Sequence, residues 1–213
     1  MLEGQKCLVI GSGISGIGAV ALLEKYHADV VLYDSSDKLT KEDLEAKLPG
    51  ESKAVCIAGE LPEEVELSIQ AAVLSPGVPT DIPLVNRMRD RGVQILGEIE
   101  LGFLAEQGRV IAITGTNGKT TTTTLTGEIM KAHFGAEKTF VVGNIGNPYT
   151  LEVTKTSKDS VTVGEISSFQ LETIHTFHPV VSAILNITPD HLNRHHTICL
   201  LYTSPSPRDR SLS

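Results

Sequence analysis

The chain has 213 residues, a net charge of −8 at pH 7 and 40% apolar residues, a composition that suits one large or two modest globular domains. The acidic balance argues against general affinity for nucleic acid, which needs clustered Lys and Arg. No apolar stretch approaches the roughly 20 residues of a membrane helix and no secretory segment opens the chain, so we expect a cytoplasmic protein that binds no membrane.

The first part of the chain alternates short apolar runs with helix-like segments. We expect strands at Cys7–Ile10, Val30–Tyr33, Val55–Ile57, Ala72–Leu74 and Val93–Leu96. We expect helices from Gly16 to Glu24 and from Leu84 to Arg91. This alternation predicts a parallel sheet with helices packed on it.

The pattern restarts near residue 97. A helical segment, Glu98–Gln107, precedes a short buried strand at Val110–Ile113 and a helix from Lys119 to His133. Three more strands are expected at Phe140–Val142, Ser160–Val163 and Val180–Leu185. The sequence therefore predicts an α/β fold in two units, the first over residues 1–96 and the second over residues 97–197.

Residues 198–213 differ in kind from the rest. They combine Pro, Ser and Arg without apolar periodicity, which predicts a disordered segment. A basic tail that is open to phosphorylation is one interpretation. We favour the other, an unstructured or foreign end.

The strongest motif runs from Thr114 to Thr121, directly after a predicted strand and at the start of a predicted helix. Glycines in such a loop let backbone N–H groups surround phosphates, and the helix N-terminus adds positive partial charge. We expect Lys119 to reach the β- and γ-phosphates of a nucleotide and the Thr120 hydroxyl to bind Mg²⁺. Ile113 stands at the usual first glycine position, so Gly115 and Gly118 supply the flexibility. The alternative is a glycine-rich turn that precedes a lysine.

A second glycine motif, Gly11 to Gly16, also lies between a strand and a helix. Asp34 closes the next strand near the spacing of a ribose-binding acid, so the segment fits a dinucleotide-binding fingerprint. Ser75 lies in a turn after another strand, where ligand crevices form in parallel sheets. We expect a diphosphate ligand and leave its nucleotide open. The alternative is that the glycines only allow close packing of the helix on the strand.

Three polar segments of the second part each follow a predicted strand: Gly143–Gly146, Glu165–Glu172 and Asn186–His191. Glu165 and His191 could reach the same Mg²⁺–phosphate centre as the lysine loop. Taken alone, Glu165 would be a solvated acid at a strand end, and His191 a helix cap or a surface histidine.

Together these segments resemble the Mur ligases. Thr114–Thr120 is similar to the ATP loop that the Mur ligases share with folylpolyglutamate synthetase. In combination with Gly143–Gly146, Glu165–Glu172 and Leu185–His191, it is similar to the family members that add D-glutamate to UDP-N-acetylmuramoyl-L-alanine. The resemblance covers about residues 5 to 197.

The resemblance implies a Rossmann-like N-terminal domain for the UDP part of the substrate, followed by a P-loop ATPase-like α/β central domain that uses ATP and Mg²⁺. Catalysis is expected from Lys119, Glu165 and His191, with Thr120, Glu165 and His191 as metal ligands. The implied ATP-binding residues are Gly115, Thr116, Asn117, Gly118, Lys119, Thr120 and Thr121. The implied substrate-binding residues are Gly11, Gly13, Ile14, Ser15 and Ser75 for the uridine and diphosphate, and Asn144, Ser167 and Gln170 for the muramoyl-alanine end.

The resemblance also implies a role in peptidoglycan precursor synthesis through an acyl phosphate, in a protein that is monomeric when full length. Asn193 stands where the family has an aspartate. The family's carbamylated lysine, its adenine contacts and its third domain have no counterpart in the sequence. We therefore expect the central domain to be incomplete and this chain alone to be inactive.

Two other functions compete with this interpretation. The first is another ATP-dependent amide ligase of the folylpolyglutamate synthetase type, which the Gly11–Gly16 domain disfavours. The second is a nicotinamide-dependent oxidoreductase built on the same Gly11–Gly16 motif, which would leave Thr114–Thr121 without a purpose.

Overall fold

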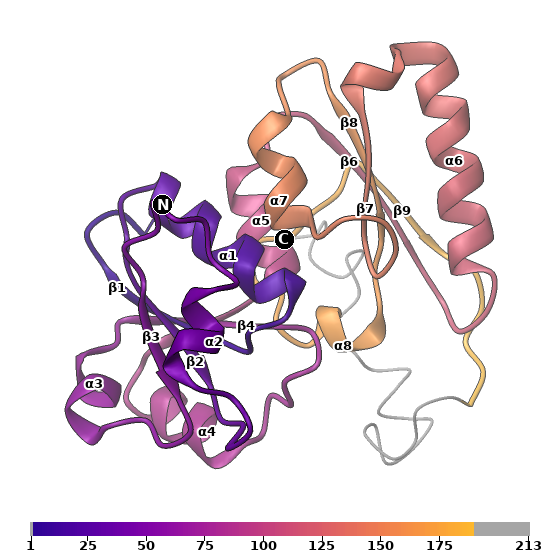
Figure 1. Ribbon diagram of the computed structural model, residues 1–213. Helices are drawn as coiled ribbons and strands as arrows, with labels where there is room; N and C mark the ends of the chain where they lie inside the picture. Colours follow the sequence, from indigo (N-terminus) through magenta and orange to yellow (C-terminus); the bar gives the residue numbers. More distant parts are fainter. Residues whose placement is uncertain (1, 190–213) are drawn as a thin grey trace. The chain divides into compact units, whose positions relative to one another are not determined.

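The computed structural model describes residues 2–189, and they form two compact units that divide between Leu101 and Gly102. Figure 1 shows that each unit is built on its own sheet of parallel strands. The division falls a few residues after the predicted restart at residue 97. The α/β class expected from the alternating pattern is confirmed.

The first unit contains five parallel strands in the order β3-β2-β1-β4-β5. Their bounds are β1 Lys6–Ile10, β2 Asp29–Asp34, β3 Val55–Ala58, β4 Ala71–Leu74 and β5 Gln94–Gly97. This is the strand order of a Rossmann-like sheet, in which the chain reverses direction across the sheet between β1 and β4. Ligands bind outside the carboxyl ends of the strands at such a point.

Helices cover both faces of this sheet. Helix α1 (Ile14–Lys25) packs against β1, β2 and β4 through a buried face that includes Ala19, Val20 and Leu23. Helix α4 (Pro83–Asp90) starts with a proline at its first turn, where the missing N–H has no helical partner to lose. Its buried residues belong to the apolar cluster on the other face.

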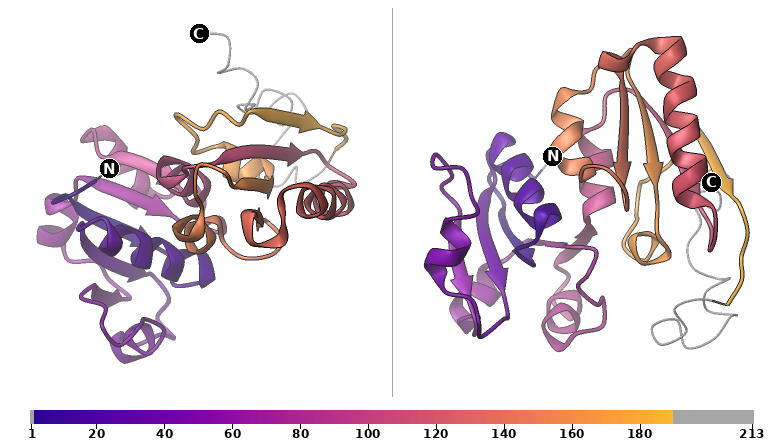
Figure 2. Two further views of the ribbon diagram at one scale, coloured as in Figure 1. Left: turned by 90° about the horizontal axis from the view of Figure 1, so that it is seen from above. Right: turned by 45° about the vertical axis from the view of Figure 1, so that its right-hand side comes forward.

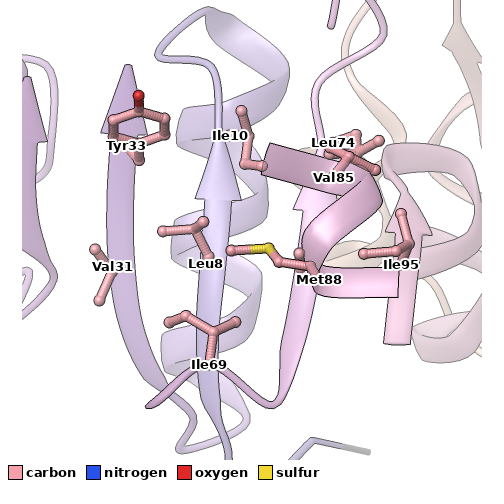
Figure 3. Packing of buried hydrophobic residues seen from close by; sticks show 10 residues of the cluster. Leu8, Ile10, Val31, Tyr33, Ile69, Leu74, Val85, Met88 and Ile95 are labelled. Atoms are coloured by element: carbon pink, nitrogen blue, oxygen red, sulfur yellow. The ribbon is translucent and has the colours of Figure 1, made fainter. Parts of the chain in front are cut away.

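That cluster shows why strands with few polar residues form the centre of the sheet. Leu8 and Ile10 of β1 point to the same face because side chains alternate along a strand, and both are buried there. Figure 3 shows Met88 of α4 reaching toward Leu8, while Val85 lies beside Leu74. The alternate residues Cys7 and Val9 are also fully buried, so β1 is covered on both sides.

The second unit contains four parallel strands in the order β7-β8-β6-β9 among the described residues. Their bounds are β6 Arg109–Thr114, β7 Thr139–Gly143, β8 Val161–Glu165 and β9 Val181–Ile184. Helix α6 (Lys119–Phe134) runs alongside the strands of this sheet, as the right-hand view of Figure 2 shows. It packs chiefly against β7 and β8. A Cβ at Gly127 would come within 2.6 Å of Val141, so the bare glycine lets α6 lie close to β7.

The expected strands and long helices are confirmed to within a few residues. Helix α5 (Glu98–Ala105) links the two sheets. Four short helices escaped prediction, because four to six residues are too few to show a helical period: α2 Lys41–Glu45, α3 Glu63–Ser68, α7 Tyr149–Glu152 and α8 Ser168–Leu171. Two 3₁₀ turns complete the fold at Ala136–Lys138 and Val153–Lys155.

His191, Asn193 and the tail over residues 198–213 lie outside the described residues, so the expectations for them stay predictions. Within residues 2–189 no helix is both long enough and apolar enough to span a bilayer.

Glu66 joins α3 to α4 through two ion pairs. Its carboxylate accepts hydrogen bonds from Arg87 at 2.6 Å and from Arg91 at 2.7 Å, while the Glu66 side chain is only 9% exposed. The hydrogen bonds from Arg87 outweigh the effect of burial, and with those from Arg91 they lower the pKa of Glu66 to about 2.

We predict that Glu66→Gln lowers the free energy of unfolding at pH 7 by about 2 kcal/mol, less than for a fully buried pair because Arg87 is 56% exposed. A depressed carboxyl pKa stabilises the fold above the ordinary value of 4.5, and this contribution is lost as the pH falls toward 2. Urea unfolding at several pH values should therefore show the difference shrinking in acid. Glu63→Gln, on the exposed side of the same helix, is the control. A loss that is the same at pH 7 and pH 2.5 would contradict the ion-pair explanation.

Candidate nucleotide-binding sites

The Gly11–Gly16 loop lies at the carboxyl end of β1, between β2 and β4. The Gly11 N–H donates to the Tyr33 carbonyl at 2.8 Å, and the Ser75 hydroxyl donates to the Gly11 carbonyl at 3.1 Å. A Cβ at Gly16 would meet the Gly11 carbonyl oxygen at 1.9 Å, so only glycine allows α1 to start this close to the loop. The structure thus brings Gly11 and Ser75 together as the sequence predicted.

Asp34 binds the glycine loop rather than standing free at the strand end. Its Oδ2 accepts from the Ser12 N–H at 3.0 Å and from the Ser12 hydroxyl at 2.6 Å, and its Oδ1 accepts from the Ser36 N–H at 3.1 Å. Burial would raise the pKa of Asp34, but the hydrogen bonds from Ser12 and Ser36 and the charge of Lys47 lower it overall. Both carboxylate oxygens are therefore engaged by the protein, which disfavours a ribose-binding role.

Lys47 is a residue of this site that the sequence analysis missed. Its ammonium donates to the Ser12 hydroxyl at 2.9 Å and lies 3.4 Å from the Ser12 carbonyl. Lys47 follows the short helix α2, whose start is fixed by a capping box between Thr40 and Asp43. The Thr-x-x-Asp pattern at residues 40–43 is a sequence signal for the start of α2. It does not predict that Lys47 contacts Ser12.

The start of α1 is open. Gly13 is the N-cap of the helix, and nothing lies within 4 Å of the position its Cβ would take. Ile14 is 73% exposed although it is apolar. Because the first N–H groups of a helix have no intrahelical acceptor, the Gly13, Ile14 and Ser15 segment offers an exposed cradle for an anion.

The second loop, Gly115–Gly118, connects β6 to α6. Gly118 is the N-cap of α6 with φ +81°, a left-handed conformation that favours glycine. The backbone N–H groups that start α6, at Lys119, Thr120 and Thr121, lack intrahelical acceptors. Free N–H groups at the start of a helix carry positive partial charge, which is the arrangement of a phosphate-binding site.

Lys119 folds back over this loop. Its ammonium donates to the Gly115 carbonyl at 2.7 Å and to the Thr116 carbonyl at 3.0 Å. The lysine thus lies at the loop, as the sequence predicted, and its charge is held by neutral carbonyl groups. A carbonyl is a weaker partner for an ammonium than a phosphate, so these contacts can be exchanged for a bound anion.

The loop that follows β9 holds the phosphate loop in place. Asn186 accepts from the Asn117 N–H at 2.9 Å and donates to the Asn117 carbonyl at 2.9 Å. The Thr116 hydroxyl donates to the Thr188 carbonyl at 3.1 Å and accepts from the Thr188 N–H at 3.0 Å. The sequence indicated a functional segment here but assigned no role to Asn186 or Thr188.

Glu165 ends β8 directly beside the phosphate loop, because its register partner on β6 is Ile113. Its side chain is 1% exposed. Asn144 donates to Glu165 Oε1 at 2.8 Å, whereas Glu165 Oε2 is buried and has no hydrogen-bond partner in the part of the chain that the structure describes. Buried polar atoms are normally paired, so an unpaired carboxylate oxygen next to a phosphate loop indicates a missing partner.

A divalent cation fits this oxygen. Mg²⁺ prefers hard oxygen ligands and is usually held by one or two carboxylates together with substrate phosphates. Residues 2–189 contain no group of three or more His, Cys, Asp or Glu that could hold a metal by protein side chains alone. A metal site that combines Glu165 Oε2 with the Thr120 hydroxyl and with phosphate oxygens agrees with the unpaired carboxylate oxygen and with the lack of a site made of protein side chains alone. His191 lies outside the described residues.

Ser167 and Gln170 lie just beyond Glu165 and form the capping box of α8. The Ser167 hydroxyl and N–H both donate to Gln170 Oε1, at 3.0 and 2.9 Å, and the Gln170 N–H donates back to the Ser167 hydroxyl at 3.3 Å. These side chains thus fix the turn after β8. Their role in substrate binding stays a prediction.

Comparison with known families agrees with this organisation. Residues 5–97 match the family described as Mur ligase MurD-like, N-terminal domain, and residues 113–202 match the Mur ligase middle domain.

The chain is similar to several curated UDP-N-acetylmuramoylalanine–D-glutamate ligases. It is 58% identical to that of Lachnospira eligens, 54% to that of Lachnoclostridium phytofermentans and 46% to that of Clostridioides difficile. These matches cover 95%, 92% and 92% of the chain but only 44%, 42% and 43% of the relatives. The chain therefore spans less than half the length of the relatives it matches.

Two solved structures share the fold. One is the UDP-N-acetylmuramate:L-alanyl-gamma-D-glutamyl-meso-diaminopimelate ligase of Neisseria meningitides, with a TM-score of 0.56 at 15% identity over 94% of this chain and 66% of that one. The other is a murein peptide ligase of Psychrobacter arcticus, with a TM-score of 0.53 at 16% identity over 95% of this chain and 47% of that one. At this identity the likeness concerns the fold alone.

We predict that Gly16→Ala destabilises the first unit by about 3 kcal/mol or more, because the new Cβ would overlap the Gly11 carbonyl oxygen. Gly13→Ala is the matched control, since it places a Cβ in open space at the N-cap and should cost about 1 kcal/mol at most. Thermal unfolding followed by circular dichroism measures both. Equal stability of the two variants would show that α1 does not start as close to the loop as described.

Proposed function

The chain belongs to the Mur ligase family, and on that premise we propose that it is the UDP-substrate-binding and ATP-binding part of a ligase that joins D-glutamate to UDP-N-acetylmuramoyl-L-alanine. The acceptor and the amino acid are those in the names of the relatives that are up to 58% identical to the chain. The reaction belongs to the synthesis of peptidoglycan precursors in the cytoplasm, and the full-length protein is proposed to act as a monomer.

One observation carries the ATP-dependent part of the proposal. A buried carboxylate oxygen of Glu165 lacks a partner at the end of β8, and the Gly115–Gly118 loop lies at the end of the neighbouring strand β6. This pairing of an anion-binding loop with an uncompensated carboxylate supports a site for a metal–nucleotide complex.

The chemistry proposed is transfer through an acyl phosphate. A carboxylate oxygen of the muramoyl-alanine attacks the γ-phosphorus of ATP, and the bond to the β-γ bridging oxygen breaks to release ADP. The amine of D-glutamate then attacks the acyl carbon, phosphate leaves, and the nitrogen loses a proton. The first step brings a carboxylate to the negatively charged triphosphate, so positive charge and oriented N–H groups must stabilise its transition state.

The residues proposed for this task come from the phosphate loop and its neighbours. Lys119 exchanges its hydrogen bonds to the Gly115 and Thr116 carbonyls for bonds to the terminal phosphates. The N–H groups that start α6, at Lys119, Thr120 and Thr121, bind the phosphate oxygens. Thr120, Glu165 and His191 are the proposed Mg²⁺ ligands. When bound, Mg²⁺ would neutralise phosphate charge and so allow a carboxylate to approach.

The first unit is proposed to hold the UDP group of the acceptor. The open N–H groups at Gly13, Ile14 and Ser15 suit a diphosphate, and Gly11 and Ser75 shape the loop beneath it. Lys47 lies beside Ser12 and adds positive charge at the same loop. Asn144, Ser167 and Gln170 are proposed to contact the muramoyl-alanine end.

We predict that Lys119→Ala weakens the binding of a non-hydrolysable ATP analogue with Mg²⁺ about 30-fold. The loss of a charge-assisted hydrogen bond of about 2 kcal/mol gives this factor. Isothermal titration of this chain measures the affinity. Lys131→Ala, which removes an exposed lysine paired with Glu128 on the same helix, should bind like the unaltered chain. Equal affinity of the two variants would rule out the phosphate role of Lys119.

We predict that UDP stabilises the chain against heat and that NAD does not. At 100 times its Kd a ligand stabilises the folded state by about 2.7 kcal/mol. The contacts of Asp34 give the reason, because its carboxylate already accepts hydrogen bonds from Ser12 and Ser36, which disfavours a bond to the ribose of NAD. Stabilisation by NAD alone would favour the oxidoreductase interpretation.

A further inference from the structure

Three of the five buried glutamates in residues 2–189 differ in how their charge is balanced. Glu66 is paired with Arg87 and Arg91. Glu152 is paired with Lys155, which lies 2.9 Å from both of its carboxylate oxygens. Glu165 receives instead a neutral amide donor, Asn144, on one oxygen and nothing on the other. Among residues 2–189, therefore, the side chain bonded to Glu165 orients its carboxylate but does not neutralise its charge.

The backbone brings Asn144 to this position. Gly143 has φ +105°, and a Cβ at Gly143 would lie 2.3 Å from the Glu165 carbonyl oxygen. Only glycine allows this approach, which lets the Asn144 N–H donate to the Glu165 carbonyl at 2.9 Å. Asn144 thus donates two hydrogen bonds to Glu165. Its backbone N–H binds the Glu165 carbonyl, and its side-chain amide binds the Glu165 carboxylate.

We propose that Asn144 is a positioning residue for a divalent cation: its amide fixes Glu165 Oε1 so that Oε2 is presented to the metal of a bound metal–nucleotide complex. The inference rests on the proposed ATP-binding function and adds a role for Asn144 that is separate from contact with the acceptor substrate. A neutral donor suits this role, because a Lys or Arg in its place would balance the charge that attracts the cation.

Asn144 is exposed while the carboxylate it holds is buried, so truncating its side chain removes little packing. The backbone bond from Asn144 to the Glu165 carbonyl does not depend on the side chain and remains in every variant. A change in the Mg²⁺ requirement of these variants therefore results from loss of the Asn144 side-chain amide and not from collapse of the loop.

The test measures how much Mg²⁺ the chain needs in order to bind a non-hydrolysable ATP analogue, with no acceptor substrate present. Partners that orient a metal ligand typically contribute about 10- to 100-fold to metal affinity, so Asn144→Ala should raise the Mg²⁺ concentration at half-saturation about tenfold or more. Nucleotide affinity in EDTA should stay within about twofold of the unaltered chain, because the amide acts only through the metal ligand. Asn144→Leu keeps the number and branching of the side-chain heavy atoms but removes the amide, so it should behave like Asn144→Ala.

Asn147→Ala is the matched control. Asn147 lies on the same loop and donates to Glu152 at 2.7 Å, so it is also an asparagine bound to a buried glutamate, but that glutamate has Lys155. The Mg²⁺ requirement of Asn147→Ala should equal that of the unaltered chain.

A second measurement tests whether Asn144 affects the Mg²⁺ requirement through Glu165 or independently of it. Glu165→Gln should raise the Mg²⁺ requirement by itself, and adding Asn144→Ala should then change it no further. Additive effects would overturn the proposal, as would an Asn144→Ala protein with an unaltered Mg²⁺ requirement. If the unaltered chain binds the nucleotide equally well with Mg²⁺ and with EDTA, both this inference and the metal part of the proposed function fail. If only Asn144→Ala is without effect, the proposed function stands and this inference alone fails.

Discussion

Parallel strands impose the constraint on which the rest of this structure depends. In a parallel sheet every strand ends at the same edge, so the segments that follow the strands gather there. In the first unit this edge collects the Gly11–Gly16 loop, Asp34 and Ser75, and in the second it collects the Gly115–Gly118 loop, Asn144 and Glu165. Residues far apart in the chain therefore share a site without any long-range motif.

Close approach of the backbone is the second requirement. At Gly16 and Gly143 a Cβ would lie within 2.3 Å of a carbonyl oxygen of the neighbouring segment. At Gly143 the close approach lets the Asn144 N–H donate to the Glu165 carbonyl. At Gly16 it lets α1 start beside the Gly11 carbonyl, with the first N–H groups of that helix available for anions. Gly13 differs, because no other atom lies within 4 Å of the position of its Cβ.

The electrostatics of the two sites differ in a way that suits the different ligands proposed for them. Asp34 accepts hydrogen bonds from Ser12 of the glycine loop and from Ser36, and Lys47 donates to Ser12, so the first site presents backbone N–H groups and a lysine. Glu165 keeps one oxygen without a partner, so the second site presents a carboxylate that attracts a cation. A diphosphate matches the first arrangement, and a nucleotide that arrives with a metal matches the second.

The sequence by itself determined the α/β class, the strands and long helices, and the two glycine loops, because each depends on local residue order. The turn from β6 into α6 could be predicted from the short stretch Thr114–Thr121, where strand, glycines, lysine and helix follow one another, while its binding of phosphate stays a prediction. Only the tertiary structure decided that Asp34 binds Ser12, that Lys47 reaches the same loop, and that Asn144 takes one oxygen of Glu165 and leaves the other unpaired. These contacts join segments separated by about 20 to 35 residues. Hydrogen-bond partners at such distances depend on strand register and on the exact path of each loop, and no local pattern encodes either.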